Sequence, residues 1–292
     1  MIRSARAEDL HAATEVFLTT LDDLRVRHNA SGAKMNFNDW LPGYEHVWRT
    51  GIFNVAEKDG KIVGVCNGVI RDKRWFLTGF WLLPGHQGEG LGGQLIEKTW
   101  ADARAQGAVQ FFVWASIDWP ALANYMKLGM LPGYQIFTMS IEKAKFTENA
   151  RTVKSENYRL EALTAEQAGD IDFVVRETRR PQDHQFWLAT MKSQAFIVKR
   201  QGATCGYFYC RNGTIGPLAY LDTADGAAIL HLALQEVFKD SEKAILYVPG
   251  ANHIVLSEIL AGGGRMLSLA HFLSTDQFGK PAQYLPSGPL LY

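Results

Sequence analysis

The stretch Pro84-Gly85-His86-Gln87-Gly88-Glu89-Gly90-Leu91-Gly92-Gly93 decides how this 292-residue sequence is interpreted. It follows an apolar run at residues 75–83, which predicts a strand, and precedes residues 94–100, which resemble a helix in composition. A glycine-rich turn between a strand and a helix favours an anion, because free backbone N–H groups and the positive end of the helix dipole point at one place. Each such interaction is worth only about 0.3–1 kcal/mol, so several acting together suit a pyrophosphate.

The glycines fit two patterns, and the first is the dinucleotide fingerprint G-x-G-x-x-G at residues 88–93. Asp118, at the end of a later strand, stands roughly where such a site places a ribose-binding acid. The context argues against this interpretation, because residues 84–87 separate the glycines from their strand and a long structured region comes first. A P-loop is excluded, since no Gly-Lys-Ser/Thr follows.

The second pattern is Q-x-x-G-x-G, at Gln87-Gly88-Glu89-Gly90-Leu91-Gly92. Preceded by Leu82-Leu83-Pro84, it resembles the acyl-CoA pyrophosphate loop of the GCN5-related N-acetyltransferases, the GNAT superfamily. About thirty residues later, Asp118-Trp119-Pro120-Ala121-Leu122-Ala123-Asn124-Tyr125-Met126-Lys127-Leu128-Gly129-Met130 resembles the family's N-x-x-A-x-x-x-Y-x-x-x-G-F helix. Asp118 and Met130 depart from the family's Asn and Phe. The two motifs, in this order, indicate a GNAT domain.

The resemblance implies roles for particular residues. It implies that acetyl-CoA, as co-substrate, is held by Leu82, Leu83, Gln87, Gly88, Glu89, Gly90, Leu91, Gly92, Gly93, Asn124 and Lys127. Backbone N–H groups around Leu82 and Leu83 would pair with the pantetheine arm and polarise the thioester carbonyl. Tyr125 would be the general acid that protonates the leaving thiolate, a step generally worth about 10²–10⁴ in rate. The competing interpretation of Tyr125 is an amphipathic residue with a buried ring and a wet hydroxyl.

The sequence leaves the general base open. Many GNAT enzymes place a carboxylate on the strand before the phosphate loop, but residues 75–83 contain none. A water chain or a residue of the second domain could serve instead, as could one of several side chains that equally suit a solvated surface: Asp22, Asp23, His28, Asp39, Glu45 and Asp118.

The acceptor pocket should form from the first two helices and the strand ends. Aromatic residues in that region favour a small, partly apolar amine: Trp40, Trp48, Trp75, Phe80, Trp81 and Trp114.

The order of predicted elements repeats along the chain. Residues 1–145 predict a strand, two helices, three strands, helix, strand, helix and strand, and residues 156–292 follow nearly the same plan after a polar linker at 143–157. We therefore expect an α/β fold of two tandem GNAT-like domains, each a mixed, mostly antiparallel sheet flanked by helices.

The second copy lacks both motifs. Leu221-Asp222-Thr223-Ala224-Asp225-Gly226 stands where the phosphate loop should lie, and its two carboxylates would repel a pyrophosphate. No tyrosine occurs in the helix predicted at residues 252–260. The chain thus resembles tandem GNAT proteins whose second domain has lost its cofactor site.

The composition excludes several classes of function. Thirty basic and thirty acidic residues cancel, so the chain has no electrostatic footprint for nucleic acid. No apolar run approaches the ~20 residues that span a bilayer, and no signal peptide opens the sequence. The three cysteines, Cys66, Cys205 and Cys210, show no C-x-x-C spacing and favour a reduced cytoplasmic setting. We expect no metal, no membrane, and a monomer or homodimer.

These observations lead to one main hypothesis and one alternative. The main hypothesis is an acetyl-CoA-dependent N-acetyltransferase that moves an acetyl group to the amine of a small molecule, with Tyr125 as general acid. The alternative is a non-catalytic acyl-CoA-binding sensor or interaction module, which the missing strand carboxylate and the departures at Asp118 and Met130 would permit.

Overall fold

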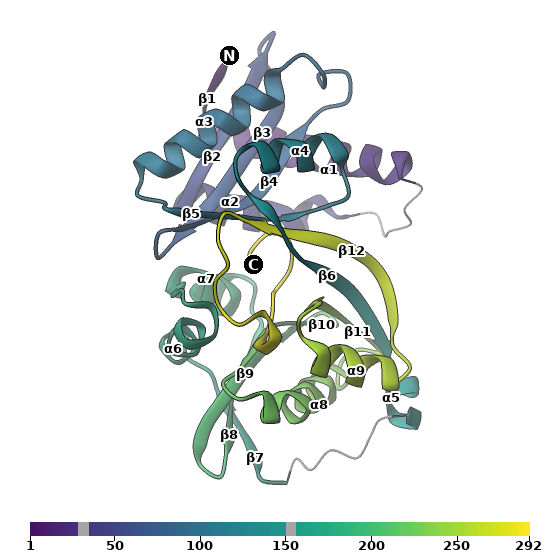
Figure 1. Cartoon of the computed structure of the whole chain (residues 1–292). Coiled ribbons are helices and arrows are strands. Elements are labelled where there is room, and N and C mark those ends of the chain that lie inside the picture. The colour runs from purple at the N-terminus through teal and green to yellow at the C-terminus, as the bar shows by residue number, and fades with distance from the viewer. Residues whose placement is uncertain (29–34, 150–155) are drawn as a thin grey trace. The chain divides into compact units, whose positions relative to one another are not determined.

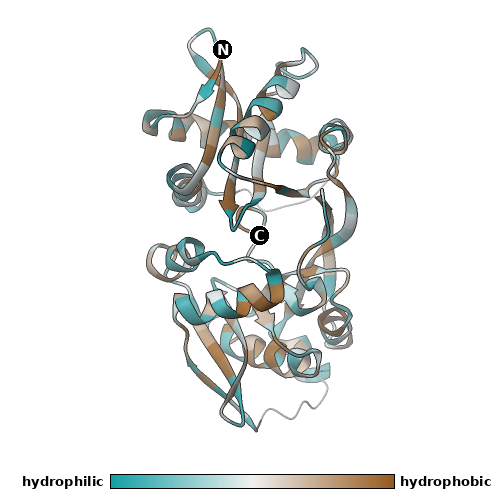
Figure 2. Cartoon of the chain, turned by 60° about the vertical axis from the view of Figure 1, so that its left-hand side comes forward, coloured by the Kyte–Doolittle hydropathy of each residue, from teal (hydrophilic) through white to brown (hydrophobic). Residues whose placement is uncertain are grey.

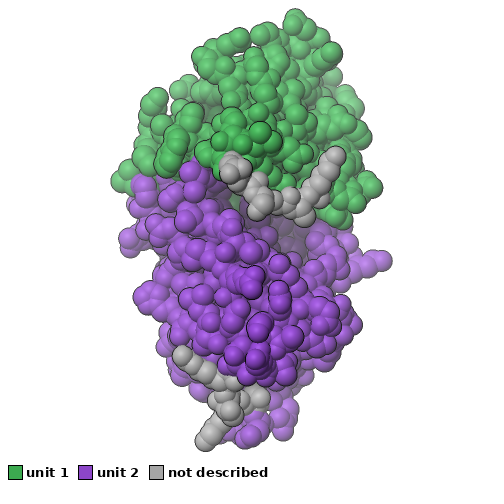
Figure 3. Space-filling model, turned by 90° about the vertical axis from the view of Figure 1, so that its right-hand side faces the viewer, with its two compact units in different colours: residues 1–113, 118–131 green, residues 114–117, 132–292 purple. Residues whose placement is uncertain are grey.

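A computed structural model of the protein describes residues 1–28, 35–149 and 156–292. It contains two compact units, unit 1 of residues 1–113 and 118–131 and unit 2 of residues 114–117 and 132–292 (Figure 3). Both contain a sheet with helices packed against it, and most of the strand pairs are antiparallel. Figure 2 shows hydrophobic residues running along the strands of both units. The predicted fold class is confirmed.

The sheet of unit 1 follows chain order. Its strands pair as β1-β2-β3-β4-β5, with bounds Ile2–Ser4, Gly51–Lys58, Lys61–Arg71, Arg74–Leu82 and Gln110–Ala115. All neighbours are antiparallel except β4 and β5, which are parallel (Figure 1). After a 3₁₀ turn at Ala7–Asp9, the helices are α1 (Leu10–Arg27), α2 (Phe37–Thr50), α3 (Leu91–Ala105) and α4 (Trp119–Lys127).

The helices of unit 1 cover its sheet from two sides. Helices α1 and α2 pack on β2, β3 and β4, and α3 packs on the same strands. Alternate residues of β3 face opposite sides. A Cβ on Gly64 would meet Leu95 of α3 at 3.4 Å, whereas Asn67, three positions on, lies beside Tyr44 of α2. The α1–α2 pair and α3 therefore lie on opposite faces.

Two tight hairpins have glycine at the position that their turn requires. Asp59 and Gly60 join β2 to β3 with φ of 52° and 74°, and Gln201 and Gly202 join β8 (Gln194–Arg200) to β9 (Ala203–Arg211) with φ of 51° and 85°. Two consecutive positive φ values are the mark of a type I′ turn, whose twist matches that of the flanking strands.

Unit 2 repeats the plan with additions. Its sheet has the order β12-β6-β11-β10-β9-β8-β7, with β13 (Tyr284–Leu285) paired to β10. The remaining strands are β6 (Leu131–Glu142), β7 (Tyr158–Ala162), β10 (Thr214–Tyr220), β11 (Lys243–Pro249) and β12 (Arg265–Ser274). The helices are α5 (Lys143–Asn149), α6 (Ala165–Arg176), α7 (Pro181–Gln185), α8 (Gly226–Val237) and α9 (His253–Ala261). Elements β7 to β12 thus correspond in order to β1 to β6.

The structure corrects the prediction of a linker at residues 143–157. Its first part forms α5, because Phe146 has an apolar cluster to bury into and is only 9% exposed. Residues 150–155 lie outside the described part of the chain. Helix α7 was also missed, since its five residues are too few to show a periodic pattern. Strand β6 packs with unit 2 almost entirely, so the compact units differ from the predicted domains 1–145 and 156–292, which stay a prediction.

Candidate functional site

The phosphate-loop motif forms a turn that only glycine readily adopts. Strand β4 ends at Leu82, and α3 begins at Leu91, so that Leu91, Gly92 and Gly93 make its first turn. Gly85, Gly88 and Gly90 have φ of 85°, 86° and 79°, and no heavy atom lies within 4 Å of where a Cβ would stand on any of them. The loop therefore exposes its backbone to open space in front of a helix N-terminus, as an anion site requires.

Two side chains of the loop bind other parts of the protein. The Gln87 amide donates from Nε2 to the carbonyl oxygen of Leu82 at 3.0 Å, which closes the loop onto the end of its strand. The Glu89 carboxylate forms an exposed ion pair with Lys58 at 3.3 Å. Gln87 thus stabilises the loop conformation, and contacts of either residue with CoA stay a prediction.

Strand β4 separates from β5 just before the loop. The two strands pair only from Arg74 with Gln110 to Leu77 with Val113, and Thr78 is an extra, bulged residue in the pairing with β3. Leu83 donates its backbone N–H to Val63 at 2.9 Å, so this donor is already used within the sheet. Because backbone groups alternate along an antiparallel strand, the N–H of Leu82 faces the opposite edge. The donor role predicted for both residues is therefore available only to Leu82.

The tyrosine of the second motif approaches the phosphate-loop helix through one aromatic residue. Tyr125 lies on α4, whose first turn is capped by Asp118 accepting from the Ala121 N–H at 3.1 Å. Its ring packs edge-on against Phe80 of β4, with the ring centroids 6.2 Å apart. A Cβ placed on Gly92, in the first turn of α3, would lie 3.3 Å from the Phe80 ring. Burial raises the pKa of the Tyr125 hydroxyl, so it keeps its proton at neutral pH and can act as a donor. The structure brings the two motifs together.

The other predicted residues of α4 lie nearer the surface. Asn124 is half-buried and Lys127 is exposed, and their contact with CoA stays a prediction.

Several candidates for the general base are engaged in other interactions: Asp22 with Arg25, Asp23 with Arg27, Glu45 with Arg49, and Asp118 with Arg27 and as the cap of α4. The structure adds no argument that assigns the base to any of them.

Only part of the predicted aromatic pocket comes together. Trp40 and Trp81 both contact Phe17, with ring centroids 4.7 and 5.0 Å away, and Tyr44 joins them at 5.7 Å. The other predicted aromatics lie elsewhere: Trp48 donates to the Ala5 carbonyl, Trp75 packs on Trp100 and Phe111, Phe80 contacts Tyr125, and Trp114 belongs to unit 2. Tyr44 was missed because a lone tyrosine in a helix looks like any amphipathic residue.

Unit 2 uses the corresponding loop for its own packing. Asp222 accepts from the Ala224 N–H at 2.9 Å and so caps a 3₁₀ turn. Asp225 is 1% exposed and binds Arg200 at 2.9 Å and the Tyr158 hydroxyl at 2.7 Å. These carboxylates therefore stabilise the unit internally where unit 1 has its glycine loop.

Within residues 1–28, 35–149 and 156–292, no helix is long and apolar enough to cross a membrane. No group of three or more His, Cys, Asp or Glu side chains in them is arranged to hold a metal ion.

Comparison with known proteins finds similarity to acetyltransferases. The sequence profile of the acetyltransferase (GNAT) family matches residues 14–130. No curated protein matches the sequence. A putative acetyltransferase from Pyrococcus horikoshii has 14% identity and a TM-score of 0.78 over 100% of this chain and 95% of its own. A tandem GNAT protein of the clavulanic acid biosynthesis pathway has 14% identity and a TM-score of 0.64, with 94% of this chain and 97% of its own covered. A GCN5-related N-acetyltransferase from Sphaerobacter thermophilus has 16% identity and a TM-score of 0.63, with 94% of each chain covered. These structures share the fold.

Proposed function

We propose that the protein transfers an acetyl group from acetyl-CoA to the amine of a small molecule, since residues 14–130 match the profile of the acetyltransferase (GNAT) family. The observation that supports this most directly is the loop at Gly85, Gly88 and Gly90, which presents open backbone before α3. We further propose that residues 156–292 form a degenerate second domain. The loop that corresponds to the glycine loop carries Asp222 and Asp225, whose carboxylates are engaged with groups of unit 2 itself. The cytoplasmic setting and the monomeric or dimeric state stay predictions.

The chemistry follows from four groups of unit 1. The loop and the N-terminus of α3 would hold the pyrophosphate through backbone N–H groups. The N–H of Leu82, on the edge of β4 that leaves β5, would stabilise the charge that develops on the thioester oxygen. Tyr125 would protonate the departing thiolate. The acceptor amine would approach from the α1–α2 face, where Trp40 and Trp81 are half-buried.

The first prediction concerns stoichiometry and turnover. Calorimetry on the full chain should show one acetyl-CoA bound per chain, because only unit 1 has the glycine loop. A screen of amines with acetyl-CoA, read by release of free CoA thiol, should then find an acceptor. Binding without thiol release from any amine would favour the sensor alternative, and two bound molecules per chain would contradict the degenerate second domain.

The second prediction tests the loop with a matched control. Gly88→Ala puts a Cβ on a residue with φ of 86° and open space around it, and Gly202→Ala does the same in a hairpin of unit 2 at φ of 85°. Both substitutions should cost about 1–2 kcal/mol of stability through the left-handed conformation. Only Gly88→Ala should weaken acetyl-CoA binding, by tenfold or more in calorimetry, because the methyl group occupies the backbone surface that faces the phosphates. Equal effects of the two variants on binding would refute the assignment.

A further inference from the structure

A buried polar cluster lies under the α1–α2 face of unit 1. Tyr44 of α2 is 2% exposed and Asn67 of β3 is fully buried, and the two side chains are neighbours. The Asn67 amide lies close enough to the Tyr44 hydroxyl to oppose the rise that burial causes in its pKa, yet among the described residues neither the hydroxyl nor Asn67 Nδ2 makes a well-formed hydrogen bond. The Thr78 hydroxyl donates to the other end of the amide, Asn67 Oδ1. Burying polar groups without partners is costly, which points to a ligand that completes them.

The cluster lies where the strands of the site separate. Thr78 is the bulged residue directly after the last pair between β4 and β5. At the next residue, Gly79, a Cβ would stand 3.3 Å from Asn67 Nδ2 and 3.2 Å from the indole nitrogen of Trp81. These two groups therefore converge over a glycine on the face opposite Phe80 and Tyr125. Thr78, Trp81 and Trp40 are half-buried, so the cluster adjoins the surface.

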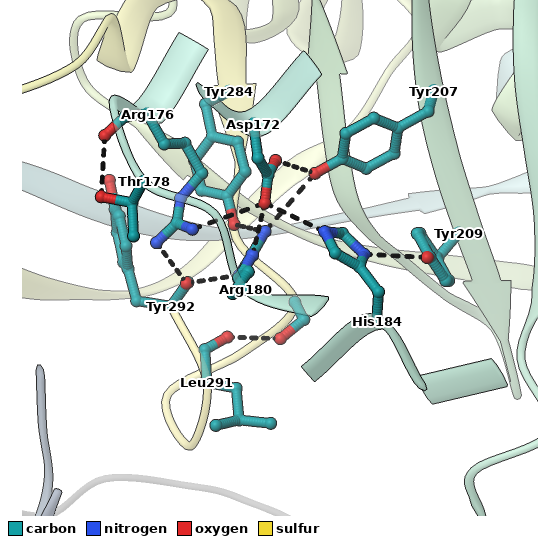
Figure 4. A network of polar contacts seen from close by, with 11 residues as sticks. Asp172, Arg176, Thr178, Arg180, His184, Tyr207, Tyr209, Tyr284, Leu291 and Tyr292 are labelled. Carbon is teal, nitrogen blue, oxygen red and sulfur yellow. Dashed lines mark hydrogen bonds and ion pairs between the residues drawn. The ribbon is translucent and has the colours of Figure 1, made fainter. Parts of the chain in front are cut away.

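Unit 2 offers an internal comparison at the corresponding elements. On α6, α7 and β9, which correspond to α1, α2 and β3, its buried polar groups satisfy one another (Figure 4). Asp172 binds Arg180 at 2.5 Å, His184 at 3.1 Å and the Tyr207 hydroxyl, and His184 binds Tyr209 at 2.9 Å. Among the described residues of this network, Arg176 is the side chain with nitrogens that lack a hydrogen bond, Nε and Nη1. Its Nη1 lies 3.5 Å from the Asp172 carboxylate, and its guanidinium lies 5.0 and 5.4 Å from the rings of Tyr284 and Tyr292. In unit 2, the buried side chains of this region therefore satisfy one another, whereas in unit 1 the Tyr44 hydroxyl and Asn67 Nδ2 form no such bonds with described residues.

We propose that Tyr44 and Asn67 bind an uncharged oxygen of the acceptor substrate and determine its specificity. The proposal rests on the proposed acetyltransfer. The Asn67 N–H and the Tyr44 hydroxyl are neutral donors, so they suit a carbonyl or hydroxyl oxygen, while a carboxylate would lose its hydration there without gaining an opposite charge. The rings of Phe17, Trp40 and Trp81 suit an apolar body. The acceptor class is therefore an amine that carries an amide or hydroxyl oxygen close to its reacting nitrogen.

Three amines of similar size test this class. Phenylalaninamide carries a neutral carbonyl, 2-phenylethylamine carries none, and phenylalanine carries a carboxylate. With acetyl-CoA and the full chain, kcat/KM for thiol release should be at least tenfold higher for the amide than for either other amine, because sites that hydrogen-bond a substrate group reject analogues without it. In Tyr44→Phe, the ratio of amide to phenylethylamine should fall at least tenfold, while the KM for acetyl-CoA is kept.

Two controls separate recognition from structure. Tyr44→Phe should keep or raise the thermal midpoint, because the hydroxyl it removes makes no well-formed hydrogen bond with any described residue. Tyr158→Phe removes a hydroxyl bonded to Asp225 at 2.7 Å in unit 2, and should lower the midpoint without changing the ratio. Titration of phenylalaninamide into the CoA-loaded protein gives a readout independent of turnover, with binding weaker in Tyr44→Phe than in the natural protein.

Several results would overturn the assignment. These are equal kcat/KM for the three amines, an equal loss on all of them in Tyr44→Phe, a change confined to the KM for acetyl-CoA, or no binding of the amide to the CoA-loaded protein. Failure of the proposed function is distinguishable from all of these, because acetyl-CoA would then either not bind or bind without thiol release from any amine of the screen.

Discussion

Replacing Tyr125 with phenylalanine is expected to lower turnover by about 10²–10⁴, the usual contribution of a positioned general acid. The substitution removes only the hydroxyl, so the ring keeps its edge contact with Phe80 and the packing of α4 is retained. Acetyl-CoA affinity should stay unchanged, because the proposed phosphate contacts come from the loop. Burst-phase or steady-state thiol release, together with calorimetry, measures both quantities.

A second tyrosine serves as the control for this experiment. Tyr220→Phe in unit 2 removes a buried hydroxyl bonded to Asn252 at 2.8 Å, and should leave turnover unchanged. Undiminished turnover in Tyr125→Phe would remove Tyr125 from the mechanism. The raised pKa of Tyr125 also predicts no loss of rate through its deprotonation up to and beyond pH 10, since burial disfavours the phenolate.

Removing the Asp172 carboxylate should destabilise the protein by about 3–5 kcal/mol, the range for breaking a buried ion pair by deleting one partner. In Asp172→Ala, the guanidinium of Arg180, which is 1% exposed, loses its counter-charge in a place that water does not reach. Urea unfolding, followed by fluorescence and circular dichroism, measures the change. The matched control is Asp170→Ala on the same helix, because Asp170 pairs with Arg179 at 3.1 Å on the surface and should contribute at most about 1 kcal/mol. Similar losses in the two variants would contradict this account of the network.

The same network predicts how stability depends on pH. The guanidinium of Arg180 and the His184 ring hold the pKa of Asp172 well below its usual range against the cost of burial, so its contribution is present above about pH 4 and is lost on further acidification. Burial lowers the pKa of His184, so the unfolded chain binds a proton that the folded protein does not. The free energy of unfolding should therefore already fall as pH drops below about 6.5. A flatter profile in His184→Gln would support this origin.

The local sequence was sufficient to predict most of the elements and the glycine loop, although not α5 or α7. The glycines at 85, 88 and 90 were recognisable because a left-handed turn before a helix needs residues without a Cβ, and all three have positive φ. The hairpins at Asp59-Gly60 and Gln201-Gly202 follow from the same chemistry. Thr164 and Gln167 form a capping box, with Gln167 bonded in both directions at 3.0 and 3.2 Å, and the spacing of these two residues is enough to indicate it. These features depend on neighbours within a few residues, so the sequence displays them directly.

No comparable signal in the sequence marks the side chains that meet across the sheet. Asn67 lies in a strand and Tyr44 in a helix, and neither belongs to a motif. Which of the six predicted aromatics would share a pocket depended on the facing of each strand and helix, and of the six, Trp40 and Trp81 joined Phe17. Leu83 likewise looked equivalent to Leu82 until strand pairing turned its N–H toward Val63.

Residue patterns alone were enough to predict the glycine-rich loop, the tyrosine helix, the repeat of the plan and the absence of both motifs from the second copy. Only the packed structure shows which backbone donors are free and where β4 leaves β5. It also shows that, among the described residues, the Tyr44 hydroxyl and Asn67 Nδ2 lie together without well-formed hydrogen bonds, while Asp172, Arg180 and His184 satisfy one another. The reason is physical. Turn and cap preferences act over a few residues, whereas hydrogen-bond satisfaction in a core depends on groups that are distant in sequence and meet only when the sheet and its helices have packed.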